Sequence, residues 1–318
     1  MAKYRHGLPP TRGERFLTDG GMETTLIFLE GIELPHFASF VLLSTPEGRQ
    51  KLKDYYVPYL DIASKAGSGF MLDSATWRAN PDWGERLGYD AAALKAVHEE
   101  AIGLLAELRD AYERPGRPIV LSGAIGPRGD GYKAGNMNAA EAEDYHAAQV
   151  ATFAATDADL VSAVTLTNLD EAIGVARAAR RHDIPCFIAF TVETDSRLVT
   201  GKTMQEAIDA VDEATGGYPL YYMINCAHPS HFSEALDHGS AWIKRIGGIR
   251  ANASTMSHQQ LDEGEMLDAG DPADLGRRYR DLIGRMPQLR VLGGCCGTDH
   301  RHIGAICAAC MPQTAMSA

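Results

Sequence analysis

Eight short apolar runs recur along the sequence, and amphipathic segments separate them. Each run is rich in β-branched or other apolar residues and ends in small and polar ones, as buried strands do. The runs occupy residues 16–21, 69–77, 119–127, 159–168, 186–193, 221–229, 246–254 and 291–298. Strands that alternate with helices pair in parallel, and eight such units close into a barrel. The sequence therefore predicts the α/β class and a single (β/α)8 TIM barrel.

The segments between the runs place apolar residues at intervals of three and four, the periodicity of a helix that buries one face. This pattern is clearest at residues 92–113, 138–156, 170–182, 203–215 and 271–286. An open, doubly wound sheet would alternate in the same way, but it carries a Gly-rich phosphate turn after its first strand. Residues 18–26, TDGGMETTL, lack the G-x-G-x-x-G spacing of that turn. The barrel is therefore favoured.

Composition limits the partners and the domain organisation. No Ser/Pro-rich linker or charge block interrupts the 318 residues, so we expect one domain, residues 1–318, with short extensions at both ends of the barrel. The net charge of -12 argues against binding to nucleic acid or to an anionic membrane, which leaves small molecules or proteins as the expected partners. We find no apolar run of about 20 residues and no signal peptide, and therefore expect a cytoplasmic protein. The sequence leaves open whether the protein forms a homo-oligomer.

Three of the six cysteines lie at the ends of predicted strands. Cys226 ends the sixth run, and Cys295 and Cys296 end the eighth. A parallel barrel brings the carboxyl ends of all its strands to one rim, so these three sulfurs should converge there. Three thiolates at about 2.3 Å form a good zinc cage, and they leave the fourth coordination position free for a substrate. We expect Zn²⁺ at a catalytic rather than a structural site.

The ligand set indicates which chemistry such a zinc site supports. A free thiol has a pKa of about 8.5, whereas a thiol that coordinates zinc is deprotonated outright. Because three thiolates outweigh the charge of the metal, the sulfur of a bound substrate should stay electron-rich. We therefore expect a thiol acceptor to attack an electrophilic methyl group, whereas hydrolysis would be better served by neutral histidine ligands.

Other interpretations of the cysteines remain open. Cys186 lies within an apolar run, and we expect it to pack in the core. Cys307 and Cys310 could join the adjacent pair in a closed four-cysteine structural zinc site, although their spacing favours one apolar face of a final helix. A metal-free protein in which Cys295 and Cys296 are oxidised together is a further alternative.

Three motifs resemble a known family when taken together in this order. They are DGGMETTL at residues 19–26, INCAHP at 224–229 and GGCCGT at 293–298. The chain resembles the homocysteine S-methyltransferase family from about Phe16 to about Ile306. That family includes betaine- and S-methylmethionine-dependent enzymes and the homocysteine-binding module of cobalamin-dependent methionine synthase.

The resemblance implies a fold, an activity and a set of site residues. It implies a (β/α)8 barrel that transfers a methyl group from a small sulfonium or ammonium donor to homocysteine, giving methionine, and hence methionine biosynthesis. Cys226, Cys295 and Cys296 match the zinc ligands of the family, and Asp19, Gly20 and Gly21 match the motif that holds the amino acid part of homocysteine. From their places at strand ends we add these candidates for substrate binding: Thr76, Thr165, Glu193, Asn225 and Asn252.

Two positions depart from the family pattern. Family members commonly carry a Glu-Thr pair at the end of the fourth strand, where this chain has Val164 and Thr165. Either Glu193 replaces the missing carboxylate or the acceptor is a different thiol. In the seventh strand, Arg250 begins a segment where a Tyr-Pro-Asn-Ser-Gly type of sequence is common.

Two residues after the second run are candidates for the wall of the substrate pocket. Trp77 could lie against a cationic methyl donor, and Arg78 could pair with a carboxylate. A core tryptophan and a surface arginine are equally compatible with the sequence.

Overall fold

The strands form one closed parallel barrel. The computed structural model describes residues 2–236, 240–264 and 266–311. The strands pair in chain order, and β1 also pairs with β8, which closes the sheet and excludes the doubly wound alternative. Their bounds are β1 Phe16–Leu17, β2 Gly69–Asp73, β3 Ile119–Ile125, β4 Leu160–Leu166, β5 Cys186–Phe190, β6 Tyr222–Asn225, β7 Ile246–Ala251 and β8 Val291–Gly294. The predicted (β/α)8 barrel is confirmed.

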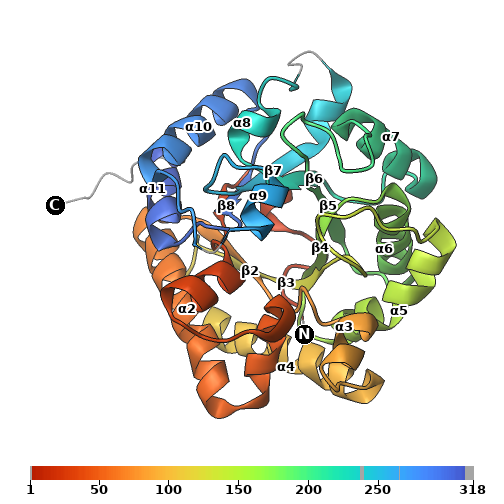
Figure 1. Ribbon diagram of the computed structural model, residues 1–318. Coiled ribbons are helices and arrows are strands. Elements are labelled where there is room, and N and C mark those ends of the chain that lie inside the picture. The colour runs from red at the N-terminus through yellow and green to blue at the C-terminus, as the bar shows by residue number, and fades with distance from the viewer. Residues whose placement is uncertain (1, 237–239, 265, 312–318) are drawn as a thin grey trace.

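The long helices form a ring around the barrel (Figure 1). The ring consists of α2 Pro46–Ala66, α4 Ala91–Tyr112, α5 Ala139–Ala155, α6 Leu169–Arg181, α7 Met204–Thr215, α10 Pro272–Arg285 and α11 His300–Cys310. The remaining helical segments are short: α1 Met22–Thr24, α3 Pro81–Arg86, α8 Pro229–Phe232, α9 His258–Asp262 and several 3-10 or π turns. The sequence determines where several helices begin, since Asn138 and Thr203 each form a capping box with a glutamate three residues later.

No helix in the described part of the chain combines the length and the hydropathy that crossing a bilayer requires.

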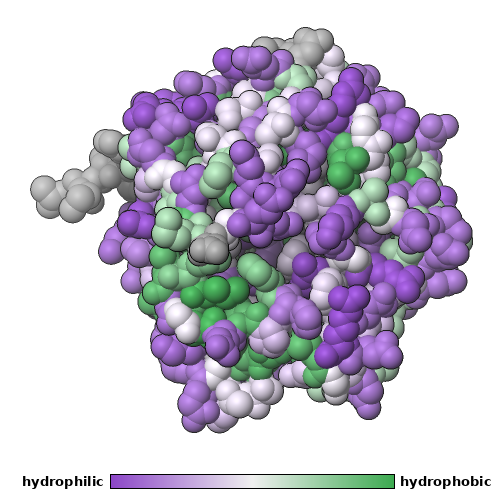
Figure 2. Space-filling model, viewed as in Figure 1, coloured by the Kyte–Doolittle hydropathy of each residue, from purple (hydrophilic) through white to green (hydrophobic). Residues whose placement is uncertain are grey.

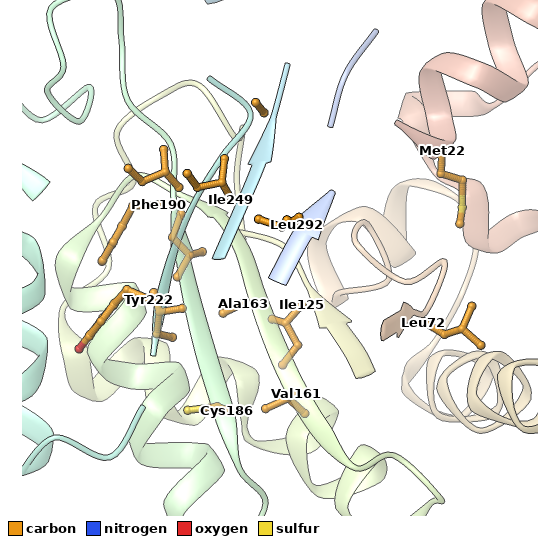
Figure 3. Close-up of a cluster of buried hydrophobic side chains, with 14 of the residues drawn as sticks. Met22, Leu72, Ile125, Val161, Ala163, Cys186, Phe190, Tyr222, Ile249 and Leu292 are labelled. Atoms are coloured by element: carbon orange, nitrogen blue, oxygen red, sulfur yellow. The ribbon is translucent and has the colours of Figure 1, made fainter. Parts of the chain in front are cut away.

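Alternation along the strands divides the apolar residues into two clusters. Leu72 and Ile188 belong to a large cluster between the strands and the helices, part of which Figure 3 shows. Their neighbours Met71 and Phe187 belong to a smaller cluster that also contains Leu8 of the N-terminal segment. Because successive side chains of a strand point to opposite faces, this second cluster fills the interior of the barrel.

A polar layer lies above the interior cluster, toward the carboxyl ends of the strands. Asp73 and Ser162 each follow a residue of the interior cluster by two positions, so they also point inward. The Ser122 hydroxyl donates to Ser162 and the Ser162 hydroxyl donates to Asp73, both at 2.8 Å. Arg250 completes the layer with an ion pair to Asp73. From the amino ends to the carboxyl ends of the strands, the barrel interior thus contains an apolar cluster, then a polar and charged layer, and then the rim.

Truncating the interior cluster should destabilise the fold. Phe187 is fully buried and its ring stacks on Tyr221 with 5.2 Å between centroids. We expect Phe187→Ala to lower the free energy of unfolding by about 3–5 kcal/mol, because the cavity cannot collapse inside a closed sheet. Urea denaturation measures this change. Leu29→Ala, at a side chain that is 52% exposed, should cost less than about 1 kcal/mol; equal losses would contradict the packing described here.

Candidate metal centre

Three sulfur atoms meet at the carboxyl-terminal rim of the barrel. The Cys226 sulfur lies 2.9 Å from that of Cys295 and 3.6 Å from that of Cys296. All three ligand atoms lie within 4.8 Å of one another, and among the described residues they form the one cluster of this kind that could hold a metal ion. Two thiolates on a tetrahedral zinc ion with 2.3 Å bonds lie about 3.8 Å apart, so the donor set fits a metal with little movement.

The backbone at Cys226 is held in an unusual conformation. Its φ is +56°, in the left-handed region that non-glycine residues seldom adopt. The carbonyl oxygen of Cys226 accepts hydrogen bonds from the Asn252 amide at 2.9 Å and from the His258 ring at 2.6 Å, while its N–H donates to Arg250 at 3.0 Å. These bonds fix a conformation that turns the sulfur from the end of β6 toward the barrel axis.

Close backbone packing positions the other two cysteines. The Cys295 N–H donates to the carbonyl of Ala251 on β7 at 2.8 Å. Gly297 has a φ of +78°, and a Cβ on Gly21 would lie 2.6 Å from the Cys295 carbonyl oxygen. Glycine is therefore required at residue 297 by its left-handed backbone, and at residue 21 because a side chain would push the Cys295 backbone away.

The clustered thiols already share their protons unequally. Hydrogen bonds from Cys226 and Cys296 hold the pKa of Cys295 well below its usual value, and the same bonds raise the pKa of the two donors. The Tyr132 hydroxyl adds contacts of 3.3 Å to Cys226 and 3.7 Å to Cys296, and burial raises the pKa of Tyr132, which keeps it a neutral donor. A bound metal would displace the thiol protons that remain in the cluster.

The other cysteines lie outside this cluster. Cys186 is fully buried in the outer apolar cluster, and burial raises its pKa to about 12. Cys310 packs in the same cluster from α11, and burial raises its pKa to about 11, while Cys307 lies half-buried on that helix. The expected core packing of these residues is confirmed, and neither Cys307 nor Cys310 belongs to the candidate metal cluster.

A cavity opens beside the three sulfurs. We call it the inner cavity; its wall includes the Asp19–Gly21 segment, Trp77, Tyr132 and Val164, and Arg250 lies at its floor. Arg250 pairs with Asp19 at 2.5 Å and with Asp73, and its Nε donates to the Gly294 carbonyl at 3.1 Å. A guanidinium thus joins the polar layer of the barrel to the rim that carries the sulfurs.

Both oxygens of the Asp19 carboxylate are engaged within the protein. One accepts from Arg250 and the other accepts from the Tyr55 hydroxyl at 3.0 Å. Burial raises the pKa of Asp19 to about 7, although Arg250 opposes this rise. The arginine therefore limits the rise in pKa that desolvation causes at this carboxyl group.

Comparison with known proteins identifies the family. The family model described as homocysteine S-methyltransferase matches residues 16–310. The chain belongs to the homocysteine S-methyltransferase family. Family membership makes it a methyltransferase and confirms the resemblance seen in the sequence motifs. No match was found among curated proteins.

Solved structures of this family share the fold. The metallated form of the homocysteine methyltransferase MmuM from Escherichia coli is 21% identical, with a TM-score of 0.72, and the match covers 96% of this chain and 99% of MmuM. The oxidized form of MmuM is 22% identical, with a TM-score of 0.70, and the match covers 94% of this chain and 99% of the MmuM chain.

The structure brings some of the expected substrate-binding residues to the inner cavity. Gly20 and Gly21 line it beside Asp19. Thr165 and Asn225 line it as a pair, since the Asn225 amide donates to the Thr165 hydroxyl at 2.8 Å and accepts from the Thr165 N–H at 3.0 Å.

Three other candidates do not line the inner cavity. The Thr76 hydroxyl donates to the Ala124 carbonyl at 2.7 Å beneath the rim. Asn252 lies behind Cys226, which it supports through the carbonyl. The Glu193 carboxylate accepts a hydrogen bond from the His258 ring at 2.8 Å, so it faces His258 and not the inner cavity.

Sequence reasoning missed two aromatic rings that shape the site. Tyr132 comes from the loop after β3 and stacks on His258, with 4.1 Å between centroids. Both nitrogens of His258 face oxygens, of Cys226 and Glu193, so the orientation of the ring is fixed from both sides. Tyr132 is the one aromatic residue in the Gly-rich segment 126–138, and a single aromatic residue in such a loop is the sequence feature that could have indicated a role at the site.

Removing the buried guanidinium should strongly destabilise the protein. Arg250→Met leaves Asp19 and Asp73 without their cation, and we expect a loss of about 3–5 kcal/mol in the free energy of unfolding. Arg277→Met provides the control, because Arg277 is 63% exposed and pairs with Asp274 on the surface, where such pairs contribute about 0–1 kcal/mol. Urea denaturation of both variants makes the comparison, and a loss below about 1 kcal/mol in Arg250→Met would refute the assigned role of the network.

Proposed function

We propose that this chain is a zinc-dependent S-methyltransferase in which Cys226, Cys295 and Cys296 hold the metal. The convergence of the three sulfurs within 4.8 Å at the wall of a cavity carries the proposal. Zinc bound there would hold a thiol acceptor as a thiolate at neutral pH. Three ligands from the protein leave one position for that sulfur.

The residues of the chain orient the acceptor and protect it from water. The methyl group of a small sulfonium or ammonium donor would meet the acceptor sulfur in line, so that the new C–S bond forms as the bond to the donor breaks. The departing donor takes that electron pair and becomes neutral. Tyr132 and Trp77 line the cavity beside the sulfurs and shield the nucleophile, while Asn225 fixes the rim beside Cys295.

Homocysteine is the acceptor that the family description names, and methionine would then be the product. A specific observation favours a second acceptor class, a small thiol without an ammonium group. Val164 lines the cavity where the family commonly has glutamate, the Asp19 carboxylate is occupied by Arg250 and Tyr55, and Glu193 faces His258. The ammonium of homocysteine would thus enter a site in which Val164 replaces one carboxylate of the family pattern, while Arg250 and Tyr55 occupy the other.

The acceptor can be tested with a matched pair of thiols. We expect kcat/KM for 4-mercaptobutyrate, which is homocysteine without its amino group, to exceed that for homocysteine by about tenfold or more, since a buried unpaired charge is costly. Val164→Glu should reverse the preference, whereas Val199→Glu at an exposed position should not. Mass spectrometry of the methylated thiols gives the rates. A wild-type preference for homocysteine would assign the acceptor to the family pattern instead.

Loss of one ligand should remove the metal. We expect Cys226→Ser to lose stoichiometric zinc and at least about 100-fold of the methyl transfer, because two thiolates cannot retain the ion. Cys307→Ser, at a half-buried position on α11, should keep both. Elemental analysis of freshly purified protein checks the zinc content. Wild-type protein without zinc would instead favour the alternative of a redox-active vicinal pair.

The cytoplasmic location, the place in methionine biosynthesis and the extent of the domain over residues 1–318 stay predictions.

A further inference from the structure

A second pocket lies outside the inner cavity and shares part of its wall. We call it the outer pocket. Its lining and that of the inner cavity have these residues in common: Glu23, Thr24, Trp77, Tyr132 and Cys296. These shared residues form a neck, so that a molecule in the outer pocket reaches the sulfurs past one carboxylate and two aromatic rings.

The charges around the outer pocket are unbalanced. Its lining contains four carboxylates, from Glu23, Asp130, Asp262 and Asp268, against the single guanidinium of Arg78. Lys133 pairs with Asp130 at 3.3 Å, which still leaves three carboxylates against one cation. That guanidinium is already stacked between two indole rings, 4.2 Å from the Trp77 centroid and 4.1 Å from that of Trp83. The electrostatic field of the pocket therefore favours a cation.

Three carboxylates line the inner cavity, and among the described residues Glu23 is the one of them that forms no ion pair. Asp19 and Asp73, which also line the inner cavity, both pair with Arg250. Glu23 accepts a hydrogen bond from the Ser39 hydroxyl at 2.7 Å and forms no ion pair within the described part of the chain. Burial raises the pKa of Glu23, and Arg78 in the same pocket lining opposes that rise only in part. A cationic ligand would supply the close counter-charge that no ion pair within the described residues provides.

The apolar part of the outer pocket indicates what kind of cation fits. Phe28, Phe37 and Met266 line it and are 41%, 43% and 86% exposed, unusual values for large apolar side chains. Figure 2 shows apolar side chains gathered beside the hollow at the centre of this face. Apolar and aromatic walls suit alkyl groups around a positive charge.

We propose that Glu23 is the counter-ion for an alkylated onium methyl donor, which enters through the outer pocket and presents its methyl group past the neck. This inference rests on the proposed function and assigns the donor end of the same site. When the methyl group leaves, the donor keeps the electron pair of the broken bond and becomes a neutral sulfide or tertiary amine. The attraction to Glu23 is lost at that moment, which assists release of the product.

Binding without turnover tests the cation preference directly. Choline and its neutral carbon isostere 3,3-dimethyl-1-butanol differ only at the charged centre, and calorimetric titration without added thiol measures their dissociation constants. We expect choline to bind at least about tenfold more tightly than the isostere. Glu23→Gln should remove most of that preference and leave isostere binding unchanged, whereas Glu30→Gln, at an exposed residue of the same segment, should retain it.

Kinetics with S-methylmethionine as the donor show whether Glu23 binds the onium group of the donor or the ammonium group of the acceptor. We expect Glu23→Gln to raise the donor KM about tenfold with kcat unchanged or higher, because the positive charge is already fading in the transition state. The KM of the acceptor should not change. A rise confined to the acceptor KM would place an acceptor ammonium at Glu23 and overturn the inference, as would equal affinity for choline in wild-type protein and Glu23→Gln.

The two proposals fail in different ways. Choline binding requires neither metal nor transfer, so it can be observed even in protein that lacks zinc. Loss of the cation preference would remove the inference about Glu23 while the zinc content of the protein stands.

Discussion

Closure of the sheet is the constraint on which the site depends. Cys226 and Cys295 lie about seventy positions apart in the sequence, directly after strands β6 and β8, which are separated only by β7. Parallel pairing brings both strand ends to one rim, and the left-handed turn at Cys226 directs its sulfur inward. The closed barrel thus brings the three sulfurs together at one rim. The hydrogen bonds to the Cys226 carbonyl fix this arrangement.

Charge is distributed along the barrel axis in a definite order. Arg250 neutralises Asp19 and Asp73 below the sulfurs, so those carboxylates stabilise the protein and are not free for a ligand. Glu23 stays without an ionic partner among the described residues, where the inner cavity meets the outer pocket. The proposed division of labour follows from this order: the sulfurs activate the acceptor, and the neck holds the donor. The polar layer thus stabilises the barrel and at the same time occupies the Asp19 carboxylate beside the sulfurs.

Much of the fold could be predicted because strand and helix periodicities are local. Each observed strand lies within its predicted run, although β1 is reduced to Phe16–Leu17, because the residues after it leave the sheet to line the cavity. The convergence of the cysteines followed from the barrel topology alone. The direction of a loop side chain does not follow from periodicity, so Tyr132 was missed. Glu193 was expected to bind substrate because it ends a strand, but its orientation depends on His258, which a distant segment contributes.

X-ray absorption spectroscopy at the zinc edge, on wild-type protein before and after addition of a thiol acceptor, tests the central claim most directly. The account predicts three sulfur neighbours at about 2.3 Å and one lighter atom in the resting protein, replaced by four sulfurs when the thiol binds. Four sulfurs before the thiol is added would indicate a closed structural site. An unchanged spectrum after saturation with thiol would show that the acceptor is not activated at this metal, and would contradict the account.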